Sequence, residues 1–240
     1  MISKRGQLTI FIIIGIVVIA SAAVFFSVRN QIGLDFLGSE TQPVSSFVQE
    51  CVEKAGVEGI YSIGYGGGYL NVPEPSFYEI IPYYYLDGKN YMPEKEKIAE
   101  EISGYVDESV LKCTGNFSDF GDFQIEKGEI STSTRIDDNS VFLDVNFPLS
   151  VSKENNTNIL KNFKAEIPVR LGVVYDSIAE VMDKQTEQGI CLSCITNVDK
   201  RNDIYTDIYD FENRTKIIVF RDENSKINGE AFEFVFANKY

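Results

Sequence analysis

Four cysteines carry the most reactive side chains of this 240-residue chain. Cys191 and Cys194 form a C-x-x-C motif, whereas Cys51 and Cys113 are isolated in the sequence. In a protein outside the cytoplasm, an even number of cysteines favours disulfides. We expect the pairs Cys51–Cys113 and Cys191–Cys194, because the two cysteines of a C-x-x-C motif are close by construction. The sequence alone leaves the other pairings open.

Two further chemistries are open to these cysteines. A C-x-x-C motif is redox-active when a strand precedes it and a helix begins at its first cysteine, because the helix N-terminus lowers the pKa of that thiol. We expect Cys191 and Cys194 to follow a helix and to precede a loop, which is the wrong context for an exported thiol oxidoreductase. A zinc site of four cysteines normally contains two close pairs. This chain has one close pair, so we expect no metal and no cofactor.

The composition excludes several kinds of active site. The chain contains no histidine, which excludes Ser-His and Cys-His catalytic pairs and histidine metal ligands. Carboxylates are abundant, but their spacing singles out no general acid and base, so we expect no catalytic residues and no enzyme. The net charge of −14 argues against a basic surface for nucleic acid, so we expect no nucleic-acid partner.

Tyrosines are concentrated between residues 61 and 91. Tyrosine is frequent in contact surfaces because it provides a large area at a low cost in conformational entropy. We expect a contact surface that includes the following residues: Tyr65, Tyr69, Tyr83, Tyr84 and Tyr85. The alternative is that about half of these side chains point into the core. The glycines at 64 and 66–68 are not followed by the G-K-[ST] of a phosphate loop, so they predict a turn.

The remaining patterns predict an α+β domain over residues 44–240, after a linker at 29–43. Apolar residues at three- and four-residue steps predict about three helices, at 44–55, 94–112 and 171–186. Residues 61–69 are expected to form a short strand and a turn. A hairpin around Asp87-Gly88 is expected at 80–92, and a strand or extended segment at 163–168. Strand pairs are expected between 122–135 and 140–151 and, in antiparallel register, between 216–221 and 230–236. The order of these elements lacks regular βαβ alternation, which favours α+β.

An apolar segment, Leu8–Val28, precedes this domain and contains no charged residue. A helix of this length, at about 1.5 Å per residue, crosses the roughly 30 Å hydrocarbon core of a bilayer. Lys4 and Arg5 precede the segment and Arg29 follows it, which favours a cytoplasmic N-terminus. We expect a single-pass protein of the cell membrane, in contact with lipid, whose C-terminal domain is extracellular. Sequons at Asn116, Asn155 and Asn213 are then candidates for glycosylation.

The sequence Lys4-Arg5-Gly6-Gln7, running directly into the apolar segment, resembles the class III signal of archaeal type IV pilins and related surface proteins. In that family a membrane peptidase cuts after the glycine, which implies cleavage between Gly6 and Gln7. The helix would stay on the mature chain as a membrane anchor or as the packed core of a filament. The resemblance implies a structural or adhesive protein that self-assembles. The alternative is an uncleaved anchor that carries a binding module for an envelope or partner protein.

Overall fold

The structure is a computed structural model that describes residues 40–154, 156–227 and 229–240. Residues Pro43–Tyr240 form one compact unit. The processing signal Lys4–Gln7, the apolar segment 8–28 and residues 29–39 of the expected linker lie outside the described residues. In the described part of the chain, no helix is both long enough and apolar enough to cross a membrane.

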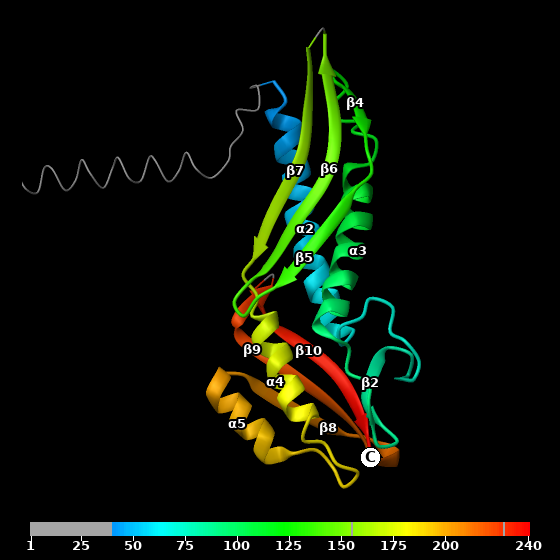
Figure 1. The fold of residues 1–240 in the computed structure, drawn as a ribbon, viewed down its shortest axis with the longest axis vertical. Coiled ribbons are helices and arrows are strands. Elements are labelled where there is room, and N and C mark those ends of the chain that lie inside the picture. Colours follow the sequence, from blue (N-terminus) through cyan, green and yellow to red (C-terminus); the bar gives the residue numbers. More distant parts are fainter. Residues whose placement is uncertain (1–39, 155, 228) are drawn as a thin grey trace, which may run out of the picture. The chain divides into compact units, whose positions relative to one another are not determined.

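The described residues form an α+β fold with four α-helices and two β-sheets (Figure 1). The helices are α2 (Gln42–Tyr65), α3 (Lys95–Thr114), α4 (Leu171–Met182) and α5 (Leu192–Asn202), with a short 3-10 helix at Glu212–Arg214. The four-stranded sheet contains β4 (Gln124–Lys127), β5 (Ser131–Ile136), β6 (Val141–Lys153) and β7 (Asn156–Ile167). The six-stranded sheet contains β1 (Ser76–Phe77), β2 (Ile81–Leu86), β3 (Lys89–Asn90), β8 (Tyr205–Asp210), β9 (Thr215–Ile227) and β10 (Glu230–Lys239).

Strand β6 is the centre of the four-stranded sheet, because β4, β5 and β7 all pair with it in antiparallel register. Its buried residues alternate along the strand: Val141, Leu143, Val145, Phe147, Leu149 and Val151. This alternation is the pattern that predicted the strand, and its pairing with the preceding segment is confirmed. Helix α2 packs on the apolar face so closely that a Cβ atom at Gly56 would lie 2.5 Å from Leu143 Cδ1.

Strand β10 is the centre of the six-stranded sheet, where it pairs with β9 in antiparallel and with β2 in parallel register. Phe232, Phe234 and Phe236 of β10 are almost completely buried. Helices α4 and α5 lie over one face of this sheet (Figure 1). The pairing of β9 with β10 was predicted, but the sheet is mixed and not purely antiparallel. Because β2 and β10 are far apart in the sequence, no turn chemistry could indicate their pairing.

Helix α2 continues through the segment that was expected to form a strand and a turn. The prediction ended the helix at residue 55 because a glycine follows, but Gly56 and Gly59 both lie inside it. A side chain at either position would press against the core, since a Cβ atom at Gly59 would lie 3.0 Å from the Tyr105 ring. The chain turns after Tyr65, where Gly67 and Gly68 adopt positive φ angles of 54° and 86°.

Helix α5 and strand β8 were not predicted, so the described residues contain four helices and not about three. Ile195 and Val198 are the only buried residues of α5, which gives too short an apolar pattern to indicate a helix. Among the described strands, β8 pairs with β9 alone, and its Tyr205 and Tyr209 are exposed. An exposed edge strand of this kind lacks the apolar alternation that identifies a strand.

Candidate functional site

The four cysteines form two disulfides with the expected pairing. Cys51 lies within α2 and is 2% exposed, and Cys113 lies in the last turn of α3. This bridge joins two helices across a sequence separation of 62. Cys191 and Cys194, by contrast, are separated by only 3 positions in the sequence.

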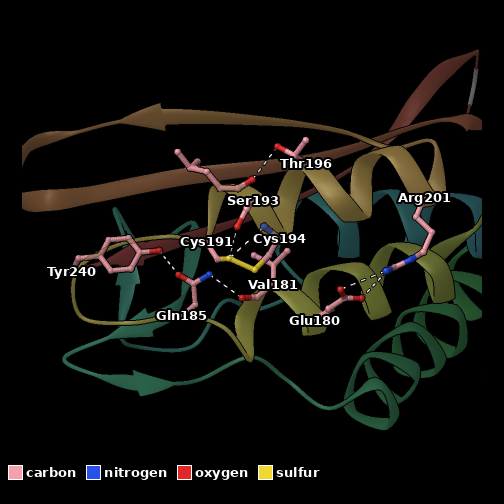
Figure 2. The surroundings of a disulfide bond; sticks show 10 residues. Glu180, Val181, Gln185, Cys191, Ser193, Cys194, Thr196, Arg201 and Tyr240 are labelled. Atoms are coloured by element: carbon pink, nitrogen blue, oxygen red, sulfur yellow. Dashed lines mark hydrogen bonds and ion pairs between the residues drawn. A yellow bond between two sulfur atoms is a disulfide. The ribbon is translucent and has the colours of Figure 1, made fainter.

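The Cys191–Cys194 bridge lies at the N-terminus of α5 (Figure 2). The pair follows helix α4, as expected, but the expectation that it precedes a loop is wrong, because α5 begins at Leu192 with Cys191 as its N-cap. The backbone N–H of Cys194 donates a hydrogen bond to Cys191 Sγ at 3.3 Å. The Oγ atom of Ser193, an exposed residue, lies 3.5 Å from the same sulfur. The sequence carries only a short trace of this helix, the three-residue spacing of the buried Ile195 and Val198 directly after the motif, which is too short to establish a helical period.

Helix α5 is held in place by contacts that do not involve its disulfide. Arg201 Nη2 pairs with Glu180 Oε2 of α4 at 2.6 Å (Figure 2). Asn202 Nδ2 donates to Ser177 Oγ of α4 at 2.7 Å, and Arg170 Nη2 donates to Asn202 O at 2.5 Å. The first turn thus presents a partly exposed disulfide on a supported helix, with the neighbouring Leu192 62% exposed.

A polar cluster lies close to this bridge at the end of α4 (Figure 2). The hydroxyl of Tyr240 donates a hydrogen bond to Gln185 Oε1, and Gln185 Nε2 donates to Val181 O at 3.0 Å. Burial raises the pKa of Tyr240 to about 12. The hydroxyl therefore stays protonated at neutral pH and remains a donor to Gln185.

A second candidate site is an open groove of about 610 Å³ between the end of α2 and the start of β2. We call it the tyrosine groove. It is lined by Ser62, Tyr65, Gly66, Tyr69, Leu70, Asn71, Val72, Glu79, Ile80, Ile81 and Val235. The structure therefore brings together Tyr65 and Tyr69, two of the five tyrosines that were expected to form a contact surface. Ile80, which is 64% exposed, adds an apolar contact area that the tyrosine pattern did not indicate.

Both groove tyrosines are surrounded by groups that keep their hydroxyls protonated. The hydroxyl of Tyr65 donates to Glu233 Oε2 at 3.3 Å. A hydrogen bond with Tyr61, burial and the charge of Glu233 raise the pKa of Tyr65. Burial and the charge of Glu101 raise the pKa of Tyr69. The groove thus offers neutral aromatic faces and hydroxyl donors beside acidic groups.

The other three tyrosines of the expected contact surface lie elsewhere. Tyr84 is 0% exposed and Tyr85 is 6% exposed, so both belong to the core and offer no surface for contact. This is a correction with a simple cause, since β2 packs beside the central strand β10 and buries side chains on both faces. Tyr83 is half-buried and packs against Phe77, with ring centroids 6.4 Å apart.

Two of the three sequons are accessible. Asn116 and Asn213 are exposed, and Asn155 lies outside the described residues. In the part of the chain that the structure describes, no cluster of three or more acidic or cysteine side chains is arranged to hold a metal ion. No protein-family model, curated protein or solved structure matches this chain.

Proposed function

We propose that this chain is a membrane-anchored cell-surface protein with a structural or adhesive role, built as a type IV pilin-like subunit. The observation that supports this proposal best is that all four cysteines are paired in disulfides. Disulfides persist outside the cytoplasm and are rare inside it. They agree with the orientation inferred from Lys4 and Arg5, in which the residues after the apolar segment are exported.

The pilin-like form is supported by the N-terminal sequence. Cleavage between Gly6 and Gln7 would leave the apolar segment 8–28 at the start of the mature chain. In a filament, packing of this segment between subunits replaces its contact with lipid. The described unit, Pro43–Tyr240, is then the part that each subunit presents to its surroundings.

The tyrosine groove favours a second candidate, in which the uncleaved chain is an anchored binding module for an envelope or partner protein. Aromatic side chains are enriched at protein contacts, and the neutral hydroxyls of Tyr65 and Tyr69 add hydrogen-bond donors. The groove is concave and lies beside Glu79 and Glu233, which favours a partner with basic or hydroxyl groups.

Cleavage of the N-terminus distinguishes the pilin-like subunit from the uncleaved, anchored binding module. We would express the full-length chain in an archaeal host that has the class III peptidase and compare it with Gly6→Val and with Ser3→Ala. The pilin-like form predicts a mature N-terminus at Gln7 in the parent and in Ser3→Ala, and an intact N-terminus in Gly6→Val. An intact N-terminus in all three proteins would overturn processing and leave the uncleaved anchor.

Substitutions in the tyrosine groove test whether it contacts a partner. We would replace Tyr65 and Tyr69 together by serine and use Tyr209→Ser as the control, since Tyr209 is 53% exposed but lies on β8, outside the groove. Surface adhesion or filament assembly should fall at least about fivefold in the double variant and remain unchanged in the control. Equal adhesion and assembly in all three proteins would remove the groove from the function.

A further inference from the structure

We propose that the Cys191–Cys194 disulfide exchanges with cysteine thiols of other exported proteins, so that the chain is a thiol–disulfide exchange partner at the cell surface. This activity is separate from the structural or adhesive role and lies at a different place in the fold. It rests on four features of the bridge: its short span, its position on a helix, its accessibility and the support beneath it.

A structural role explains this bridge poorly. A disulfide stabilises a fold mainly by closing a chain loop in the unfolded state, and the effect grows with the length of that loop. Cys51–Cys113 closes a separation of 62 residues, but Cys191–Cys194 closes a separation of 3. Arg201 and Asn202 hold the C-terminal end of α5 to α4 without the bridge, so the position of the helix does not depend on the short loop that this disulfide closes.

The helix position stabilises the reduced form of this bridge. The N-terminus of a helix carries a partial positive charge, which favours a thiolate on the capping cysteine. The N–H of Cys194 already points at Cys191 Sγ in the oxidised state, at 3.3 Å. Cys113 has the opposite position, in the last turn of α3, where the partial negative charge disfavours a thiolate. The two bridges are therefore chemically unequal.

The sulfur of Cys191 is accessible to an incoming chain. Cys191 and Cys194 are each half-buried, and Ser193, whose Oγ lies 3.5 Å from Cys191 Sγ, is exposed. Leu192, 62% exposed, lies between them in the sequence and offers an apolar contact to residues that flank a substrate cysteine. Ile195 and Val198 are buried beneath and keep the first turn in place. The substrate class is thus an exposed or unfolded cysteine segment of another exported protein.

The exchange balances without a further cofactor. A substrate thiolate attacks Cys191 Sγ, a substrate–Cys191 disulfide forms, and the Cys191–Cys194 bond breaks with Cys194 leaving as a thiolate. A second substrate thiolate then attacks the substrate sulfur and releases Cys191 as a thiolate at the helix N-terminus. The substrate dithiol loses two electrons and two protons, and the Cys191–Cys194 pair gains them. Exchange in the reverse direction with another disulfide restores the bridge.

A pair of single-cysteine variants tests the inference in the full-length protein. Cys194→Ser leaves Cys191 free at a helix N-terminus, and Cys51→Ser leaves the exposed Cys113 free near a helix C-terminus. Both proteins would be incubated with oxidised glutathione near neutral pH, and the glutathione adduct would be followed by intact mass. We expect Cys194→Ser to react about tenfold faster. A rate equal to or below that of Cys51→Ser would overturn the inference.

The unmodified protein provides a second test that does not depend on the folding of a variant. Full-length protein in membranes would be equilibrated with glutathione buffers of increasing reduced fraction, then alkylated and digested. We expect alkylation at Cys191 and Cys194 under conditions in which Cys51 and Cys113 remain joined. Joint reduction of both bridges, or reduction of Cys51–Cys113 first, would show that the C-x-x-C bridge has no special reactivity and would overturn the inference.

Discussion

The hydroxyl of Tyr84 donates a hydrogen bond to the carbonyl oxygen of Gly67 at 2.9 Å. This bond ties strand β2 to the turn that follows α2, and it lies in the core because Tyr84 is 0% exposed. Burial raises the pKa of Tyr84 well above its usual value, so the hydroxyl is a permanent donor. The same turn forms one wall of the tyrosine groove, so the shape of the groove depends on this buried contact.

We predict that Tyr84→Phe lowers the free energy of unfolding by about 1–2 kcal/mol, because it leaves a buried carbonyl oxygen without its donor. Tyr209→Phe, at a residue that is 53% exposed, should change it by less than about 0.5 kcal/mol. Denaturant titration of the detergent-solubilised proteins measures both values. An equal effect of the two substitutions would show that the Tyr84 hydroxyl does not hold the turn.

Alanine substitution is predicted to have opposite effects at two helical glycines, one packed against β10 and one exposed. A Cβ atom at Gly64 would lie 2.2 Å from Glu233 O, so Gly64→Ala must push α2 away from the strand. We expect a loss of about 2–3 kcal/mol in the free energy of unfolding. Gly104 is exposed within α3 and has no atom within 4 Å of an added Cβ, so Gly104→Ala should stabilise the protein by about 0.5–1 kcal/mol.

Thermal unfolding of both glycine variants in detergent gives the comparison. A stable Gly64→Ala protein would contradict the close approach of α2 to β10.

The two disulfides are predicted to differ in their contribution to stability. By loop closure, replacing Cys51 and Cys113 with serine should cost about 4 kcal/mol, and replacing Cys191 and Cys194 about 2 kcal/mol or less. Denaturant titrations of the two double variants under identical conditions measure the difference. If replacing Cys191 and Cys194 lowered the free energy of unfolding more, that bridge would be the main stabilising disulfide of the fold. This result would contradict its interpretation as an exchangeable disulfide.

The Tyr240 hydroxyl predicts a pH dependence at the alkaline end. Its pKa rises from 10.0 to about 12 on folding, so its stabilising effect is complete below pH 10 and disappears as the pH approaches 12. Because the side chain is partly exposed, we expect an effect of only about 1 kcal/mol. Between these pH values the parent protein should lose about this much more stability than Tyr240→Phe. If the stabilities of the two proteins changed with pH in parallel, the alkaline loss of stability would not come from the Tyr240 hydroxyl.

The parts of the fold that follow from the sequence are those with a strong local pattern. The alternation from Val141 to Val151 predicted β6, and the apolar steps from Ile98 to Val110 predicted α3. The parallel pairing of β2 with β10 could not be predicted from the sequence, because it joins segments that are far apart in the chain. The full length of α2 was not predicted, because a glycine such as Gly56 is usually read as a helix end. In the structure this glycine lies inside the helix, where it allows close packing on the sheet.

The candidate sites were also predicted only in part, because residue types and spacings can be read from the sequence but long-range packing cannot. The cysteine pairs followed from residue type and spacing, and of the five predicted contact tyrosines Tyr65 and Tyr69 do line one groove. The sequence could not show that Tyr84 is buried, since burial depends on the neighbouring strands. It also placed a loop after Cys194, because the two buried residues of α5 are too few to establish a helical period.

We propose that the described unit is exported and remains attached to a processed N-terminal helix. The most direct test is mass spectrometry of protein from native membranes, alkylated before reduction, with the N-terminal peptide and the cysteine peptides read together. We predict an N-terminus at Gln7 and a closed Cys51–Cys113 bridge. An N-terminus at Met1 or Ile2 with the same bridge would leave the uncleaved anchor. Alkylated, unpaired Cys51 and Cys113 would contradict export itself.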